Sequence, residues 1–282
     1  MRIVARIDET VLDLLQARFP QASKTTLRQM LRHRRVTRDG RVVSRADIPV
    51  EAGQVIEIAA AGRESAPDPP GRIHFRDAHL IAIEKPAGLL SVARDPVADD
   101  TFYRRVHAYV RESSGGHERI FIVHRLDREA SGIMLFALSP EIQEKLQRNW
   151  ADTEKRYWAV VEGRPPEETG TIRSWLRENR AHRVYSGPRS PEAKLAVTHY
   201  RVRQTVPGRA LLDVRIETGR KNQIRAHLSE LGCPVVGDRK YGARTNPIRR
   251  LGLHAFLLAF THPVSGERIR LRLPLPSAFR IE

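Results

Sequence analysis

The sequence has few of the features of secreted, membrane or disulfide-stabilised proteins. Cys233 is the one cysteine in 282 residues, which excludes a disulfide framework and a cysteine-based zinc site. No apolar run approaches the ~18–20 residues of a membrane-spanning helix, and the charged N-terminal stretch lacks the apolar core of a signal peptide. We therefore expect a cytoplasmic protein that does not associate with membranes.

Acidic residues are scarce relative to basic ones. The chain has 33 Asp and Glu against 49 Lys and Arg, a formal charge of +16. Such an excess is typical of proteins that bind a polyanion such as nucleic acid, although an arginine-rich genome composition would produce a similar balance. Hydrophobic residues make up 40% of the chain, which is enough for a folded core.

The sequence lacks motifs for nucleotide-cofactor and metal chemistry. It has no glycine-rich phosphate-binding loop, and His124, His227 and His254 lie far apart without a short-range pair of ligands. Packing or RNA contact explains these histidines better than a metal triad does. We expect no metal and no cofactor.

A segment rich in Ala, Gly and Pro divides the chain. Residues 59–71 (AAAGRESAPDPPG) show no apolar period and are typical of an extended linker. The lengths on either side suit one small and one larger domain. We predict a front domain at residues 1–60, a linker at residues 61–72 and a catalytic domain at residues 73–282.

The front domain combines two predicted helices with a hairpin. Apolar residues at positions 11, 12, 14, 15 and 19 follow the helical period up to Pro20, and Ser23 suits the N-cap of a second helix. A strand near residues 35–37, an Asp39-Gly40 turn and a strand from Arg41 predict a β-hairpin.

Basic residues gather on the second helix and the hairpin. Residues 24–41 contain seven Lys or Arg and one acid. Arg28, Arg32 and Arg35 recur at i, i+4 and i+7, so we expect them to share one helix face. RNA phosphates would neutralise this charge, and a merely solvated face is the alternative.

The back domain contains more predicted strands than helices. Residues 141–150 suit a helix, and apolar β-type runs lie at residues 80–83, 119–124, 133–138, 157–162, 198–203, 210–216 and 269–273. These strands do not alternate regularly with helices. The pattern predicts an α+β domain with a large mixed sheet.

Asp127 is the first candidate for chemistry. It lies in HRLDREASG (residues 124–132), between one predicted strand and a Ser-Gly turn. A carboxylate in a loop between buried strands is costly unless it is paired or functional. From residue type alone, however, an ordinary turn aspartate is the better interpretation.

The full string HRLDREASG closely resembles the catalytic motif of the RluA-type family of pseudouridine synthases. Further strings are similar to motifs of that family and follow the family's order: EKPAG (residues 84–88), KRY (155–157), TGRKNQIRAHL (218–228), GDRKYG (237–242) and LHA (253–255). The resemblance covers nearly all of residues 73–282. One departure is Lys221-Asn222, where the family commonly has a small or hydroxyl residue followed by His.

This resemblance implies the pseudouridine-synthase fold, with a mixed, mainly antiparallel sheet flanked by helices, and isomerisation of uridine in RNA. The reaction breaks the C1′–N1 bond, turns the uracil and joins C1′ to C5 without redox change or energy input. Asp127 would be the catalytic carboxylate, which either captures C1′ or assists proton loss from C2′. The resemblance also implies Arg225 as the ionic partner of Asp127, and Tyr157 as the residue stacked on the target base.

RNA contacts follow from the same comparison. Arg125 matches the family position whose guanidinium takes the place of the flipped base. Residues 7–60 resemble the α-L RNA-binding module of ribosomal proteins of the S-four type, which implies phosphate contacts from Lys24, Arg28, Arg32 and Arg35. In the back domain we assign RNA contacts to Arg220 and to a basic stretch, with a solvated loop as the alternative for the stretch: Arg239, Lys240, Arg244, Arg249 and Arg250.

The leading hypothesis is therefore a monomeric RNA pseudouridine synthase that binds RNA with both domains. Within the family, an added α-L module accompanies mostly large-subunit ribosomal RNA, so 23S rRNA is the favoured substrate and tRNA the alternative. One rival is a catalytically silent RNA-binding or ribosome-assembly factor, which would not need Asp127, Tyr157 and Arg225 together. Another is a glycosidase or N-glycosylase, for which no second carboxylate lies near Asp127 in the sequence.

Overall fold

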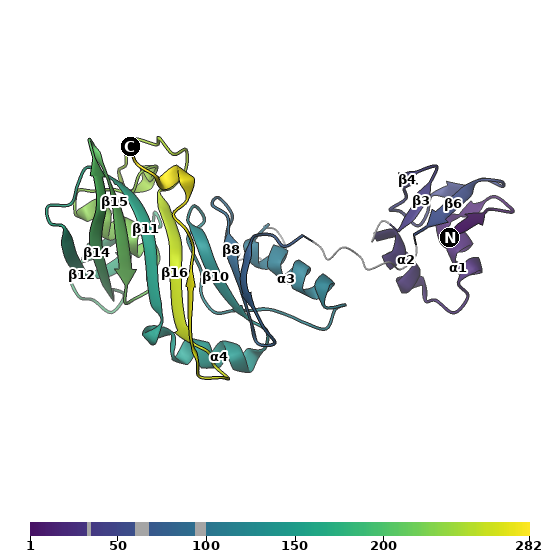
Figure 1. Cartoon of the computed structure of the whole chain (residues 1–282), viewed down its shortest axis with the longest axis horizontal. Helices are drawn as coiled ribbons and strands as arrows, with labels where there is room; N and C mark the ends of the chain where they lie inside the picture. Colours follow the sequence, from purple (N-terminus) through teal and green to yellow (C-terminus); the bar gives the residue numbers. More distant parts are fainter. Residues whose placement is uncertain (33–34, 60–67, 94–99) are drawn as a thin grey trace. The chain divides into compact units, whose positions relative to one another are not determined.

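Two compact units, Met1–Ala66 and Pro67–Glu282, make up the chain in the computed structural model (Figure 1). The structure describes residues 1–32, 35–59, 68–93 and 100–282. Most of the predicted linker, residues 61–72, lies outside the described residues. The last residue of the predicted linker, Arg72, is bound to the second unit, because the Glu84 amide donates to its carbonyl at 2.9 Å.

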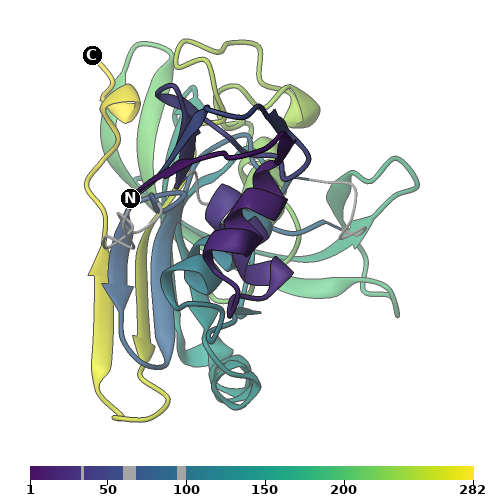
Figure 2. The same cartoon turned by 90° about the vertical axis from the view of Figure 1, so that its right-hand side faces the viewer.

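The front unit packs two helices against a small antiparallel sheet of order β1-β6-β3-β4 (Figure 2). Its core is aliphatic and includes Leu15, Leu27 and Ile56, all fully buried. The Thr10 hydroxyl caps the first helix by accepting from the Asp13 amide. The elements are β1 Arg2–Val4, β2 Glu9–Thr10, α1 Val11–Arg18, α2 Lys24–Arg32, β3 Val36–Arg38, β4 Arg41–Val42, β5 Pro49–Val50 and β6 Val55–Ile58.

The helix α2 ends too early for the predicted arginine stripe. Arg35 lies beyond the helix, so the i+7 spacing does not place it on the same face as Arg28. Its guanidinium donates instead to the Ala59 carbonyl at 3.3 Å, next to the end of β6. Lys24 and Arg28 are exposed, and the side chain of Arg32 lies outside what the structure describes.

The catalytic unit is built around one large sheet with helices beside it (Figure 1). Its first half contains β7 Ile73–Arg76, β8 Leu80–Lys85, α3 Phe102–Ser113, β9 Phe121–Ile122, β10 Ser131–Ala137, α4 Pro140–Arg148 and the short 3₁₀ turn η1 Trp150–Asp152. Its second half contains β11 Glu154–Glu162, β12 Thr169–Glu178, β13 Val184–Gly187, β14 Lys194–Val206, β15 Arg209–Ile216, α5 Gln223–Glu230, η2 Arg239–Tyr241, β16 Leu253–Thr261, β17 Arg268–Arg272 and η3 Ser277–Phe279.

The sheet is mixed and mainly antiparallel, as predicted. Among the described residues, 11 strands follow the order β13-β12-β14-β15-β11-β16-β10-β8-β7, with β17 beside β16 and β9 beside β10. The parallel neighbours in it are β10 and β16. They approach closely at Gly132, where an added Cβ would lie 2.2 Å from the Ala255 carbonyl oxygen and φ is +124°. Glycine is therefore required at this position, and the Ser-Gly pair that the sequence predicted as a turn forms the start of β10 instead.

Apolar side chains cover both faces of the central strands. One cluster includes Phe102, Phe136 and Val214, and the other includes Trp158, Phe256 and Phe279. Two layers of core hold β11, β16 and β10 rigidly, so loops at their ends can carry the site.

The predicted strand at residues 119–124 is shorter than expected. Only Phe121 and Ile122 pair with β10, as the strand β9. Beyond them, the Leu135 amide of β10 donates to His124 Nε2 at 3.0 Å. A ring nitrogen thus takes the place of a backbone carbonyl as the acceptor. The chain thus leaves the sheet before Asp127.

Candidate active site

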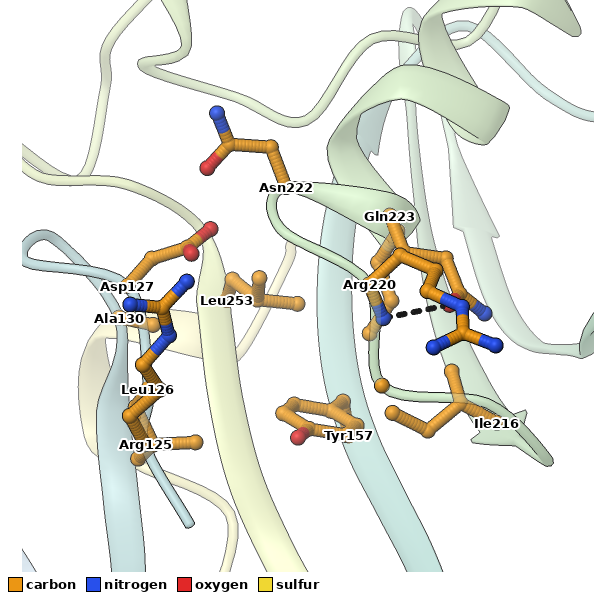
Figure 3. Close-up of a pocket in the computed structure, with 12 residues that line it drawn as sticks. Arg125, Leu126, Asp127, Ala130, Tyr157, Ile216, Arg220, Asn222, Gln223 and Leu253 are labelled. Carbon is orange, nitrogen blue, oxygen red and sulfur yellow. Dashed lines mark hydrogen bonds between the residues drawn. The ribbon is translucent and has the colours of Figure 1, made fainter. Parts of the chain in front are cut away.

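A pocket with an open volume of about 440 Å³ lies where the loop after β9 faces β11 and the start of α5. Asp127 and Arg125 line one side, Tyr157 forms part of the floor, and Arg220 lies on the opposite side (Figure 3). Among the described residues that line it, Asp127 is the only carboxylate. The remaining lining residues are Leu126, Ala130, Ile216, Gly219, Asn222, Gln223, Ile224 and Leu253.

The loop that carries Asp127 is fixed from outside the pocket. The Ser91 hydroxyl donates to the Leu126 carbonyl at 2.7 Å and accepts from the Leu126 amide at 3.1 Å. On the other side of Asp127, the Arg128 carbonyl accepts from the Gly88 amide and from the Lys85 ammonium, both at 2.9 Å. The Lys-Pro-x-Gly segment thus restrains the position of Asp127 without contacting it.

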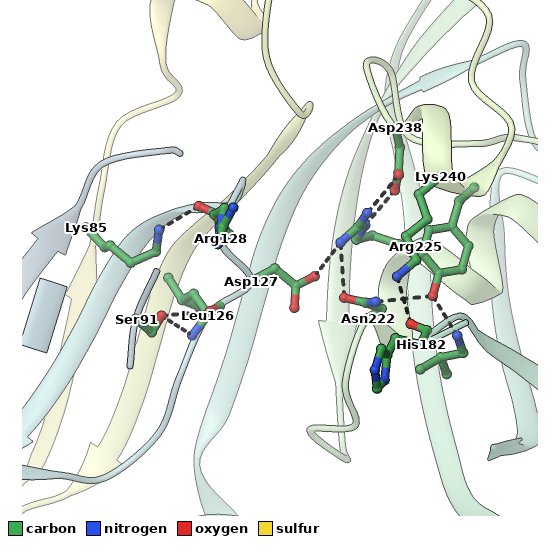
Figure 4. A network of polar contacts seen from close by, with 12 residues as sticks. Lys85, Ser91, Leu126, Asp127, Arg128, His182, Asn222, Arg225, Asp238 and Lys240 are labelled. Carbon is green, nitrogen blue, oxygen red and sulfur yellow. Dashed lines mark hydrogen bonds and ion pairs between the residues drawn. The ribbon is translucent and has the colours of Figure 1, made fainter. Parts of the chain in front are cut away.

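Arg225 joins Asp127 to a second carboxylate. Its Nε and Nη2 donate to the two oxygens of Asp238 at 2.6 and 2.8 Å, and its Nη1 donates to Asp127 Oδ2 at 3.3 Å (Figure 4). The Asp238 side chain is 1% exposed and that of Asp127 is 22% exposed. Asp238 therefore orients the guanidinium, while Asp127 remains accessible from the pocket.

Arg225 stays positively charged although its side chain is largely buried. Burial would lower its pKa, but the hydrogen bond and charge of Asp238, together with Asp127, raise the pKa above its ordinary value. The face of Tyr241 lies 5.0 Å from the guanidinium carbon and adds a cation–π contact. This permanent cation donates a hydrogen bond to Asp127 and orients its carboxylate.

Asn222 occupies the position where this sequence departs from the family pattern. Its φ of 51° is left-handed, a conformation that asparagine tolerates better than most residues, and it precedes α5 as the N-cap. Its Oδ1 accepts from Arg225 Nη1 at 3.0 Å, and its Nδ2 donates to the Tyr241 hydroxyl at 3.2 Å. Asn222 thus shares the Nη1 group of Arg225 with Asp127.

Tyr157 and the turn before α5 complete the walls. Burial raises the pKa of the Tyr157 phenol, and the charge of Asp127 raises it further, so the hydroxyl stays protonated. The buried Gln223 side chain accepts from the Arg220 amide at 3.0 Å and donates to the Val197 carbonyl at 3.0 Å. This bond orders the turn at Arg220 (Figure 3).

The predicted site residues fall into two groups. Asp127, Tyr157, Arg125 and Arg220 line one pocket, and Arg225 contacts Asp127 from behind. Lys240 does not line the pocket: it is exposed and donates to the His182 carbonyl at 2.7 Å.

Arg250 does not fit the predicted phosphate contact. Its Nη2 donates to the Ser131 hydroxyl at 2.7 Å and to the Leu253 carbonyl at 3.3 Å, and its guanidinium lies over the Phe279 ring. It therefore ties the first residue of β10 to the first residue of β16.

The side chains of His124, His227 and His254 make structural contacts inside the fold. Burial lowers the pKa of His124 to about 3 and that of His254 to about 4, so both are neutral. His124 stacks on Trp150, and His227 bonds Ser174 and Thr198. In the part of the chain that the structure describes, no three His, Cys, Asp or Glu side chains gather in a way that would hold a metal ion.

Sequence reasoning missed several residues that shape this site. The string GDRKYG contains Asp238 but does not by itself indicate its bond to Arg225, and the sequence gives no indication of the contacts made by Lys85, Ser91 and Asn222. The motif strings GDRKYG and EKPAG were the available signals for Asp238 and Lys85.

Comparison with known proteins identifies the family. A model of the RNA pseudouridylate synthase family matches residues 79–230, which include Asp127, Tyr157 and Arg225. The chain therefore belongs to the RNA pseudouridylate synthase family. It is an isomerase that converts uridine to pseudouridine in RNA, and the predictions of the activity and of the α+β fold of the back domain are confirmed.

Individual proteins that are similar to this chain also carry the names of pseudouridine synthases. An uncharacterised RNA pseudouridine synthase of Mycobacterium bovis is 36% identical over 214 residues, 73% of this chain and 69% of the relative. The ribosomal large subunit pseudouridine synthase D of Pseudomonas aeruginosa is 32% identical over 293 residues, 97% of this chain and 89% of the relative. Among solved structures, human RNA pseudouridylate synthase domain containing 4 matches with a TM-score of 0.60 and 26% identity over 73% of this chain and 89% of that chain.

None of the helices that the structure describes has the length and apolar character needed to span a bilayer.

Proposed function

We propose that this enzyme forms pseudouridine in 23S ribosomal RNA, with Asp127 as the catalytic carboxylate. The observation that carries the proposal is that Asp127, held from behind by Arg225 and Asp238, lines the same pocket as the Tyr157 ring. Among the described residues no donor reaches Asp127 Oδ1, so this oxygen is available to the sugar of a bound uridine.

Glycosidic cleavage develops positive charge at C1′, which an ionised carboxylate stabilises or captures. Arg225 fixes the orientation of the Asp127 carboxylate through a hydrogen bond. The Tyr157 ring stacks on the uracil, and its protonated hydroxyl is placed to donate a hydrogen bond. Arg125, exposed at the rim, fills the place that the flipped base leaves in the RNA.

The extent of the similarity to named relatives favours ribosomal RNA as the substrate. Relatives named ribosomal large subunit pseudouridine synthase D match 92% and 97% of this chain, so the similarity runs through the front unit. We infer that this unit is the α-L RNA-binding domain, in which the exposed Lys24 and Arg28 contact phosphates. We further propose that the enzyme acts as a monomer in the cytoplasm.

Glycoside hydrolysis needs a second catalytic carboxylate in the pocket, and the described lining residues do not supply one. Asp238 is buried and bound bidentately to Arg225, which leaves Asp127 as the only carboxylate among the described lining residues. The pocket therefore favours isomerisation over hydrolysis.

Pseudouridine mapping of all RNA from a strain that lacks the gene tests the substrate. We expect one or more sites to disappear from 23S rRNA and to return with the parent gene, but not with Asp127→Asn. Loss confined to tRNA would identify the alternative substrate. An unchanged pseudouridine map of every RNA would contradict the proposal.

A further inference from the structure

Strands β12, β14 and β15 of the catalytic sheet, together with the start of β11, have an exposed face turned away from the pocket. Tyr157 points toward the pocket from β11, and because successive side chains of a strand alternate, Arg156 points to the other side. Across the sheet Arg156 lies opposite Arg215 of β15, which lies opposite His199 of β14. His199 in turn lies opposite Thr171 of β12.

Arginines dominate this face, here called the arginine face. Its described members are Arg156, Thr171, Arg173, Trp175, Arg177, Tyr185, Arg189, His199, Arg201 and Arg215. An open hollow of about 1020 Å³ lies on it, lined in part by Arg156, Arg201 and Arg215.

Carboxylates neutralise only part of the charge on the arginine face. Arg156 pairs with Asp213 and Glu154, and Arg215 pairs with Glu217 at 3.6 Å. The other four arginines have no carboxylate at ion-pair distance among the residues that the structure describes: Arg173, Arg177, Arg189 and Arg201. Six arginines therefore face three carboxylates, and such an excess is stable where an anion lies against it.

Aromatic rings hold two of these guanidinium groups. Arg189 lies over Trp175 at 5.2 Å, and Arg177 lies over Tyr185 at 4.8 Å. Gly187 makes room for Arg177, because an added Cβ would lie 2.9 Å from its Nε. A stacked guanidinium loses little further freedom when it binds, and its plane suits bidentate contact with phosphate.

We propose that the arginine face binds a second segment of the RNA substrate through its phosphates, on the opposite side of the sheet from the pocket. RNA fits better than an acidic protein, because Val197 and Trp158 of this face are buried and the half-buried rings of Trp175 and Tyr185 are each covered by a guanidinium group, which leaves little apolar surface for a protein anchor. The proposal rests on RNA being the substrate and is independent of the choice between rRNA and tRNA.

Charge removal provides the first test. The double variant Arg173→Gln and Arg201→Gln of the full chain should bind long structured RNA more weakly, with the slope of log affinity against log salt reduced by about 0.7–0.9 for each lost phosphate contact. Its turnover on a minimal stem-loop should equal that of the parent. The control variant Arg272→Gln and Arg280→Gln removes the same charge from exposed positions elsewhere in the unit and should leave the slope unchanged.

A tethered cleavage reagent locates the RNA directly. Thr171→Cys places a thiol at the exposed centre of the arginine face, and the natural Cys233 is buried and protected from labelling. An iron chelate on Cys at this position should cut long bound RNA outside the target stem, whereas the same label at Arg272→Cys should not. Equal slopes of log affinity against log salt for the parent and the Arg173/Arg201 variant would overturn the proposal. An acidic protein would then be the next ligand to test on the arginine face. Absence of turnover by the parent on every RNA would instead count against the proposed function.

Discussion

Lys85 donates a hydrogen bond of 2.9 Å to the carbonyl oxygen of Arg128, the residue that follows Asp127 (Figure 4). The same buried ammonium donates to the carbonyls of Pro86 and Leu89 at 2.8 and 2.6 Å. One side chain thus closes its own loop and attaches that loop to the catalytic one. Burial lowers the pKa of Lys85 to about 8, although the charges of Glu129 and Asp127 oppose the shift.

Lys85→Met should lower both stability and turnover. It leaves the carbonyls of Pro86 and Leu89 without this donor and the Arg128 carbonyl with the Gly88 amide alone, so we expect the free energy of unfolding to fall by roughly 2–5 kcal/mol. Turnover should fall about tenfold or more, because the loop around Asp127 loses a restraint. Denaturant unfolding and single-turnover kinetics measure the two effects, with the exposed Lys145→Met as the control.

The stability difference should also depend on pH. The pKa of Lys85 is about 8 in the folded state, against an ordinary value of 10.5. Between these values the unfolded chain binds more protons, so the contribution of Lys85 to the free energy of unfolding rises with pH. The gap between parent and Lys85→Met should therefore widen from pH 8 to 10. A gap that is constant over this range would contradict the assigned pKa.

Asp238→Asn tests whether Asp238 positions Arg225. Removal of one carboxylate from a buried ion pair should cost about 3–5 kcal/mol of stability. Turnover should fall about 10²-fold, because Arg225 can then turn fully toward Asp127 or Asn222. Asp213→Asn is a matched control, since its side chain is also buried in an arginine pair but faces away from the pocket. If both variants lost turnover equally, Asp238 would have only a structural role.

Motif resemblance and periodicity predicted much of this unit, but not its central strand. β16 (LHAFLLAFT) is buried at every position except the last, so it shows no alternation from which a strand could be recognised. α3 did carry a signal: Thr101 caps it, and Phe102, Val106 and Val110 recur at helical spacing on its buried side. That helix could have been predicted from the sequence.

The site was predictable to the extent that motifs specify it. The order of motifs predicted Asp127, Tyr157 and Arg225 as one site, and the structure brings them together. The Asp238 contact depends on the path of the chain between α5 and η2, which no residue spacing determines. Arg35 was misplaced because a spacing of seven has meaning only while the helix continues.

Asp127→Asn should abolish pseudouridine formation and leave RNA affinity within a few-fold of the parent. The substitution keeps the shape of the side chain and removes the ionised carboxylate, while Arg225 retains an acceptor at the same place. Filter binding and a tritium-release assay measure the two quantities. Turnover within tenfold of the parent would exclude Asp127 as the catalytic group.

Tyr157→Phe should separate stacking from proton donation. The ring remains, so RNA affinity should stay within a few-fold, whereas loss of the hydroxyl should lower turnover by about 10²-fold or more. Because burial raises the pKa of the phenol above its ordinary value, the ratio of parent to variant should be flat between pH 6 and 9. A ratio that changes tenfold within this range would indicate that the hydroxyl ionises there.

The last prediction concerns RNA binding by the front unit. The double variant Lys24→Gln and Arg28→Gln removes two exposed charges of α2 and should make the salt dependence of long-RNA binding shallower by about 0.7–0.9 per contact. A chain that begins near Pro70 should show a larger change and still modify a minimal stem-loop, because the catalytic unit has its own core.

The matched control is Arg2→Gln with Arg45→Gln, which removes the same charge from the same unit at residues already paired with Glu57 and Asp47. If Lys24 and Arg28 contact phosphates, this control should keep the parent slope, since an arginine engaged by a carboxylate releases few counterions from RNA. Equal slopes in the parent, both double variants and the truncated chain would show that α2 presents only a solvated face. A loss of slope in the control alone would move the RNA contact to the sheet of the front unit.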